Sequence, residues 1–115
     1  MNLSLLYNMS GASANTVFER LGGEAQTLSF VKKFPSDKTF SLLKESFESS
    51  DVETAFRAAH TLKGVAATLG FEKLRSASSE LTEILRNKTF EGAAEPLEKT
   101  EKEYLAVVNT IKTLD

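Results

Sequence analysis

The sequence contains no cysteine and only one histidine among its 115 residues. Without cysteine the chain can form no disulfide, no thiolate zinc site and no thiol redox couple, which is compatible with the cytoplasmic location that we expect. A single histidine also leaves too few ligands for a first-row metal site. Any imidazole chemistry in this protein must therefore take place at His60.

An excess of one charge and long apolar runs are also missing. The 14 basic and 16 acidic side chains nearly balance, so a nucleic-acid partner is not indicated. Apolar runs extend over only a few residues, and the N-terminus lacks the basic region and cleavage pattern of a signal peptide, so no membrane association is expected. Hydrophobic residues make up 41% of the chain, which favours one folded domain, residues 1–115, over disorder.

Prolines are few and no segment shows the alternation typical of a strand, so the chain is predicted to be all-α. Residues 2–9 are expected to form a short helix that carries Leu3, Leu6 and Tyr7 and ends at Ser10-Gly11. Ser13 or Asn15 is expected to cap a second short helix, which Gly22-Gly23 stops. A lead-in helix with Ala25, Leu28, Val31 and Phe34 on its apolar side should follow and end at Pro35.

Four longer helices are predicted after residue 35, over about 36–49, 51–69, 71–86 and 92–114. Ser50 and Glu53 have the spacing of a capping box at the start of the second of these helices, and Gly70 marks its end. Short connections favour an antiparallel up-down four-helix bundle, residues 36–115, with the short helices of residues 1–34 covering one end.

The helix predicted over residues 51–69 has one apolar side and one open side. Its apolar side consists of Ala55, Ala58, Ala59, Leu62, Val65, Ala66 and Leu69. His60 lies opposite, so it should face water. Its neighbours on the same face are Glu53, Phe56, Arg57, Lys63, Gly64 and Ala67. Two cations and two very small side chains therefore surround the imidazole.

This surrounding suits an imidazole that accepts a phosphoryl group. Lys63 and Arg57 favour the neutral ring by repulsion and attract an anion. Gly64 cannot crowd the ring, although an exposed glycine inside a helix costs about 1 kcal/mol relative to alanine. An ordinary surface histidine among solvated charges is the alternative interpretation, and Glu53 is more readily explained as a capping residue than as a base.

The stretch His60-x-Leu62-Lys63-Gly64, followed by Gly70, resembles the signature of histidine-containing phosphotransfer domains, the four-helix modules of multistep phosphorelays. The resemblance implies that His60 accepts a phosphoryl group from a receiver-domain aspartyl phosphate or a histidine kinase and passes it to a response regulator. Lys63 would stabilise the phosphoryl charge, Gly64 and Ala67 would leave access to the ring, and Phe56, Arg57 and Phe71 would dock the partner.

The resemblance also implies a monomeric phosphocarrier without kinase or hydrolase activity of its own. The sequence has no nucleotide-binding glycine loop and no acidic triad, so no cofactor is expected on this chain, and Mg²⁺ is expected on the partner receiver domain. The rival hypothesis is a helical interaction module that binds a partner near Phe56 and Phe71 and is never phosphorylated. A domain cut from a larger hybrid kinase is a third reading, although Met1 and the ending at Asp115 favour a free-standing protein.

Overall fold

The computed structural model describes residues 3, 6–7 and 14–114, and all regular elements in these ranges are helical. The elements are α2 (Ala14–Leu21), α3 (Glu24–Lys33), the 3₁₀ turn η1 (Phe34–Ser36), α4 (Thr39–Glu48), α5 (Val52–Leu69), α6 (Glu72–Leu85) and α7 (Ala94–Lys112). The all-α prediction is confirmed. None of the helices in the described ranges is both long and apolar enough to cross a membrane.

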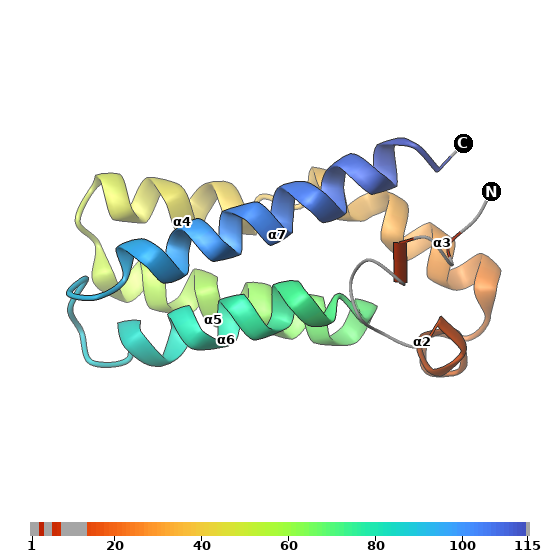
Figure 1. Cartoon of the computed structure of the whole chain (residues 1–115), viewed down its shortest axis with the longest axis horizontal. Helices are drawn as coiled ribbons and strands as arrows, with labels where there is room; N and C mark the ends of the chain where they lie inside the picture. The colour runs from red at the N-terminus through yellow and green to blue at the C-terminus, as the bar shows by residue number, and fades with distance from the viewer. Residues whose placement is uncertain (1–2, 4–5, 8–13, 115) are drawn as a thin grey trace.

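Helices α4 to α7 form an elongated bundle in which successive helices run in opposite directions (Figure 1). Helix α5 packs against α4 on one side and α6 on the other, and α6 packs against α7. Helices α4 and α7 are also in contact. The rings of Phe40 and Tyr104 are stacked with centroids 4.3 Å apart, and Lys44 Nζ lies 3.0 Å from Glu101 Oε2. The four helices therefore enclose a common core.

Helices α2 and α3 lie at one end of this bundle (Figure 1). Val17 of α2 and Val31 of α3 are fully buried in the hydrophobic core. Leu3, Leu6 and Tyr7 are helical and buried as well, whereas the rest of the predicted 2–9 helix and its Ser10-Gly11 end lie outside the described residues. The prediction that N-terminal elements cover one end of the bundle is confirmed for the parts that the structure describes.

The predicted capping box at the start of α5 is wrong. Asp51, not Ser50, caps the helix: its Oδ1 accepts a hydrogen bond from the Thr54 amide at 3.1 Å, and its Oδ2 accepts one from the Thr54 hydroxyl at 2.7 Å. Ser50 has a positive φ of 57° because it lies in the turn just after α4, where the Asp51 amide donates to the Ser46 carbonyl at 2.8 Å. This left-handed conformation is incompatible with the extended backbone of an N-cap residue.

Of the two predicted caps of α2, Asn15 lies inside the helix and does not cap it, while Ser13 falls outside the described residues. Two other helix boundaries differ from expectation. Helix α3 ends at Lys33, so Pro35 lies in η1. Helix α4 begins at Thr39, not Ser36, because the side chain of Asp37 accepts a hydrogen bond from the Thr39 amide at 2.7 Å. Tight turns before a helix are set by such local hydrogen bonds, which helical spacing does not reveal.

The apolar side of α3 also differs from its prediction. Ala25 is exposed, whereas Thr27 is fully buried. The Thr27 hydroxyl donates to the Gly23 carbonyl at 2.8 Å, so its polar atom is satisfied inside the helix and its methyl group can pack in the core.

Candidate functional site

The outer face of α5 carries His60, and its inner face carries the small side chains that were predicted there. Six apolar residues of α5 are buried, and Val65 is half-buried against the core; the six are Ala55, Ala58, Ala59, Leu62, Ala66 and Leu69. His60 is exposed to solvent. The alanines let α4 and α6 approach α5 closely, which leaves the opposite face of the helix free to present the imidazole.

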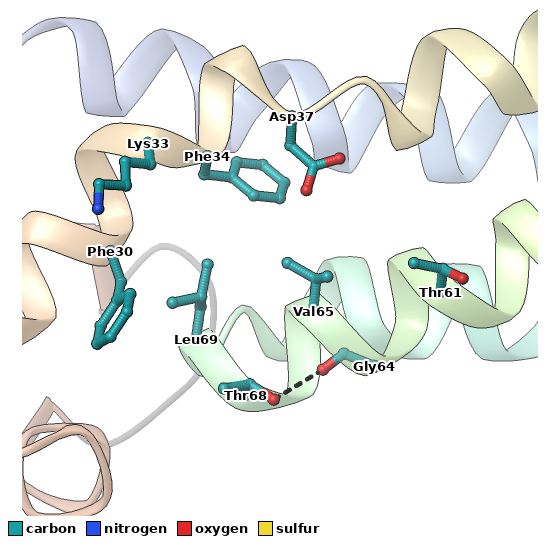
Figure 2. A pocket seen from close by; sticks show the side chains of 9 residues that line it. All are labelled: Phe30, Lys33, Phe34, Asp37, Thr61, Gly64, Val65, Thr68 and Leu69. Carbon is teal, nitrogen blue, oxygen red and sulfur yellow. Dashed lines mark hydrogen bonds between the residues drawn. The ribbon is translucent and has the colours of Figure 1, made fainter.

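Gly64 lies one helical turn after His60 and leaves an opening beside it. A Cβ atom placed on Gly64 would meet no side chain and no backbone of another element within 4 Å. The Gly64 carbonyl accepts a hydrogen bond from the Thr68 hydroxyl at 3.0 Å (Figure 2). Ala67, the other small residue expected here, is half-buried. The face of α5 at Gly64, one turn after the histidine, is therefore open.

A cavity of about 540 Å³ lies next to this opening. Figure 2 shows that α5 forms one wall through Thr61, Gly64 and Val65, while Phe30 and Lys33 of α3 stand opposite. Phe30 is 45% exposed, which is unusual for a large apolar side chain in this chain. Phe30 and Lys33 were not predicted as site residues, because they come from a different helix.

Phe56 forms the boundary of the site on the side towards the start of α5. Its half-buried ring lies perpendicular to the His60 ring, with centroids 6.1 Å apart. The guanidinium carbon of Arg86, at the end of α6, lies over the Phe56 ring at 5.1 Å from its centroid. Such a contact between a cation and an aromatic face is favourable. The predicted site on α5 is therefore completed by a residue of the neighbouring helix.

Arg86 is bound in turn to Glu83. Its Nε donates to Glu83 Oε1 at 3.3 Å and its Nη2 donates to Oε2 at 3.0 Å. This hydrogen bonding and the charge of Arg86 lower the pKa of the Glu83 carboxyl, and the charges of Lys63 and His60 lower it further. A carboxylate of α6 therefore lies within the electrostatic reach of the histidine and its lysine.

Glu83 and Arg86 were not predicted as site residues, although one feature of the sequence pointed to them. Gly70 reverses the chain between α5 and α6 with a φ of 79°, and two antiparallel helices place residues at equal distances from their turn side by side. Phe56 and Arg86 are equally far from Phe71 along the chain. Counting outward from that turn would have identified the pair.

Two residues that were predicted to dock a partner have contacts within the chain. Arg57 Nη2 lies 3.3 Å from Glu53 Oε2, so this cation is paired with a carboxylate on its own helix. Phe71 was predicted to dock a partner, and that prediction is wrong because the side chain is 0% exposed. Its ring packs against Phe34 at 5.2 Å and Tyr7 at 6.2 Å. Phe71 is a core residue at the covered end of the bundle.

Arg20 joins the N-terminal elements to the end of the histidine helix. Its guanidinium donates to the Thr68 carbonyl at 3.2 and 3.1 Å and to the Ala67 carbonyl at 3.0 Å. Carbonyls in the last turn of a helix have no partner within it, and a cation there is favourable. The C-terminal half of α5, which carries Gly64, is therefore held in place by α2.

The chemistry of the site is that of an exposed imidazole with cations nearby. No group of three or more histidine, cysteine, aspartate or glutamate side chains that could hold a metal ion occurs in the described part of the chain. His60, Lys63 and the approach over Gly64 form one surface, to which Phe56, Glu83 and Arg86 contribute from the side. Such a surface can receive an anionic group from outside, but it offers no enclosed pocket around the ring.

Comparison with known protein families gives a match to the bundle. A family model described as Hpt domain matches residues 36–113, which is more than half of the chain and includes all four helices of the bundle. No match was found among curated proteins or among solved structures.

Proposed function

The chain belongs to the Hpt domain family, whose members carry out phosphotransfer in two-component signalling, and from this premise we propose that His60 is its phosphoryl acceptor. The observation that carries the proposal is the exposure of His60 beside Gly64, over which a partner can approach unhindered. His60 is also the only histidine of the chain. The donor is an aspartyl phosphate of a receiver domain or a histidine kinase, and the final acceptor is a response regulator.

In the transfer from a receiver domain, His60 is the nucleophile. The lone pair of the unprotonated Nε2 of His60 forms a bond to phosphorus, while the bond between phosphorus and the aspartyl oxygen breaks. That oxygen keeps the electron pair, so the donor returns to a free carboxylate, and Nδ1 of His60 keeps its proton. Passing the phosphoryl group to the next receiver reverses these changes.

Transfer of this kind depends on in-line positioning and on neutralising the charge of the phosphoryl oxygens. Lys63, three residues after His60, supplies part of this neutralisation. Mg²⁺ and the acidic residues that bind it belong to the receiver in this proposal, and the present chain contributes the nucleophile and the docking surface. The protein therefore acts as a carrier of the phosphoryl group, without its own nucleotide chemistry.

The proposal is tested with His60→Gln and a phosphorylated receiver domain carrying radioactive phosphate. Wild-type protein should become labelled, the label should be lost in acid as expected of a phosphoramidate, and the variant should remain unlabelled. Because His60 is exposed, the variant should keep the wild-type melting temperature, which serves as the control for folding. Equal labelling of the variant, or acid-stable label on the wild type, would exclude His60 as the acceptor.

The wild-type result also decides between phosphotransfer and the rival interaction module. The interaction-module hypothesis placed the docking surface at Phe56 and Phe71. Phe71 is buried, so of these two residues only Phe56 can contact a partner. A wild-type protein that binds receivers but takes no phosphoryl group from any of a panel would favour the rival.

A further inference from the structure

Arg86 has a resting position that a phosphoryl group on His60 would disturb. Its side chain is 55% exposed and is bound to Glu83 by two hydrogen bonds. Its guanidinium carbon lies over the Phe56 ring, 5.1 Å from the ring centroid. The same Phe56 ring meets the His60 ring edge to face, with the two ring centroids 6.1 Å apart. Arg86 and His60 are thus neighbours of one aromatic side chain, although they belong to different helices.

A phosphoryl group and Glu83 are competing partners for this guanidinium. A phosphoryl group bears more negative charge than a carboxylate and presents three acceptor oxygens, and arginine binds such oxygens in pairs. Phosphorylation would also place this charge near the Glu83 carboxylate, which lies within electrostatic reach of His60 and Lys63. Repulsion between the two anions favours a rearrangement in which the cation moves towards the stronger one.

Arg86 is not enclosed by its neighbours on one side. A cavity of about 330 Å³ borders Phe56, Arg86 and Lys88 between the start of α5 and the end of α6. The other charged side chains on its rim, Glu53 and Arg57, are paired with each other. We propose that Arg86 is a phosphoryl-binding residue: once His60 is phosphorylated, the guanidinium leaves Glu83 and Phe56 and pairs with the phosphoryl oxygens.

This inference rests on the proposed function for its biological meaning, but it can be tested without a partner protein. Phosphoramidate, a small reagent that phosphorylates imidazole, would load His60 directly, with His60→Gln as the blank. The Nε–H signals of Arg86 and Arg75 would then be followed by NMR. Arg75 is the matched control, because it pairs with Glu72 on the same helix at the same spacing, with 2.7 Å between Nε and Oε2.

On phosphorylation the Arg86 signal should shift as the ring current of Phe56 is lost, while the Arg75 signal stays in place. Arg86→Gln should lower the equilibrium constant for accepting a phosphoryl group from a receiver about two- to fivefold, the range for one exposed ion pair, and added salt should reduce this difference. Arg86→Lys should recover part of it, and Arg75→Gln should match wild type.

An unmoved Arg86 signal in protein loaded with phosphoramidate would overturn the inference and leave the proposed function standing. Equal equilibrium constants for Arg86→Gln and Arg75→Gln would overturn it as well. Conversely, a shifted Arg86 signal in a protein that takes no phosphoryl group from any receiver would support the contact while refuting the proposed function.

Discussion

The rings of Phe56 and His60 meet edge to face, with their planes at 90° and their centroids 6.1 Å apart. The contact joins two consecutive turns of one helix, and it places an aromatic group on the side of the imidazole opposite Gly64. The histidine thus has a fixed neighbour on one side and open space on the other. A partner can therefore reach the ring more easily from the side of Gly64 than from the side of Phe56.

Substitutions at Gly64 should raise the stability of the protein without raising the rate of phosphoryl transfer. Gly64→Ala should stabilise the protein by about 1 kcal/mol, because alanine is the better helix former and its Cβ would meet nothing within 4 Å. Gly64→Gln should also raise the melting temperature, but its long side chain would occupy the approach to His60 and slow phosphoryl transfer. Thermal melts and transfer rates of the two variants would show this. A Gly64→Gln protein that transfers at the wild-type rate would contradict the steric argument.

The start of α5 should depend on Asp51 and not on Ser50. Asp51→Ala removes both hydrogen bonds to Thr54 and should lower the melting temperature, whereas Ser50→Ala should change it far less. Ser50→Gly should stabilise the protein by about 0.5 to 1 kcal/mol, because glycine adopts the φ of 57° without strain. If Ser50→Ala lowered the free energy of unfolding in urea more than Asp51→Ala does, Ser50 would be the cap, as the capping box predicts.

Acid should weaken this cap. The hydrogen bonds from Thr54 hold the pKa of Asp51 below its ordinary value of 3.8. Its contribution to stability is therefore complete above that value and is lost as the pH falls through the lower pKa of the folded state. Asp51→Asn keeps an oxygen acceptor but does not titrate, so the stability difference between wild type and this variant should shrink on acidification below pH 3.8. A stability difference that does not change with pH would show that the cap does not require the ionised carboxylate of Asp51.

Removing Arg20 should loosen the contact between α2 and the end of α5. Arg20→Ala eliminates three hydrogen bonds to the Ala67 and Thr68 carbonyls and should cost about 1 kcal/mol. Amide hydrogen exchange should accelerate in α2 and the last turn of α5 and stay unchanged in α7. Uniform acceleration in all helices would indicate a global loss of stability instead.

At high pH, Tyr7 should limit stability. Burial raises its pKa to about 12, partly offset by the nearby charge of Arg20. A raised pKa in the folded state means that stability is fully present below the ordinary value of 10.0 and falls as the pH rises towards 12. Tyr7→Phe cannot ionise, so it should lose less stability than wild type over this range in urea unfolding. Parallel losses in the two proteins would exclude this residue as the cause.

Sequence patterns predicted the helices and the outward position of His60 because both depend on spacing within one segment. The buried alanines of α5 and the stop at Gly70 follow from local rules. The choice between Ser50 and Asp51 was not predictable, since both side chains can cap a helix. It was decided by the way in which α4 ends, where Ser50 adopts the left-handed conformation.

The missed parts of the site are those that depend on distant residues. Phe71 was expected at the surface because nothing beside it in sequence shows that Tyr7 and Phe34 cover it. Glu83 and Arg86 have the spacing of an ordinary exposed ion pair, and only the packing of α6 against α5 brings Arg86 to Phe56. Helical periodicity describes one helix at a time and contains no information about such neighbours.

The covering of Phe71 also affects where this protein can be shortened. Tyr7 and Phe34 both precede residue 36, at which the family match begins. A fragment trimmed to that boundary would lose these two rings and expose an aromatic surface at the end of the bundle. Uncovered apolar surfaces of this kind favour self-association, so the trimmed fragment should be less soluble than the whole chain although it retains His60.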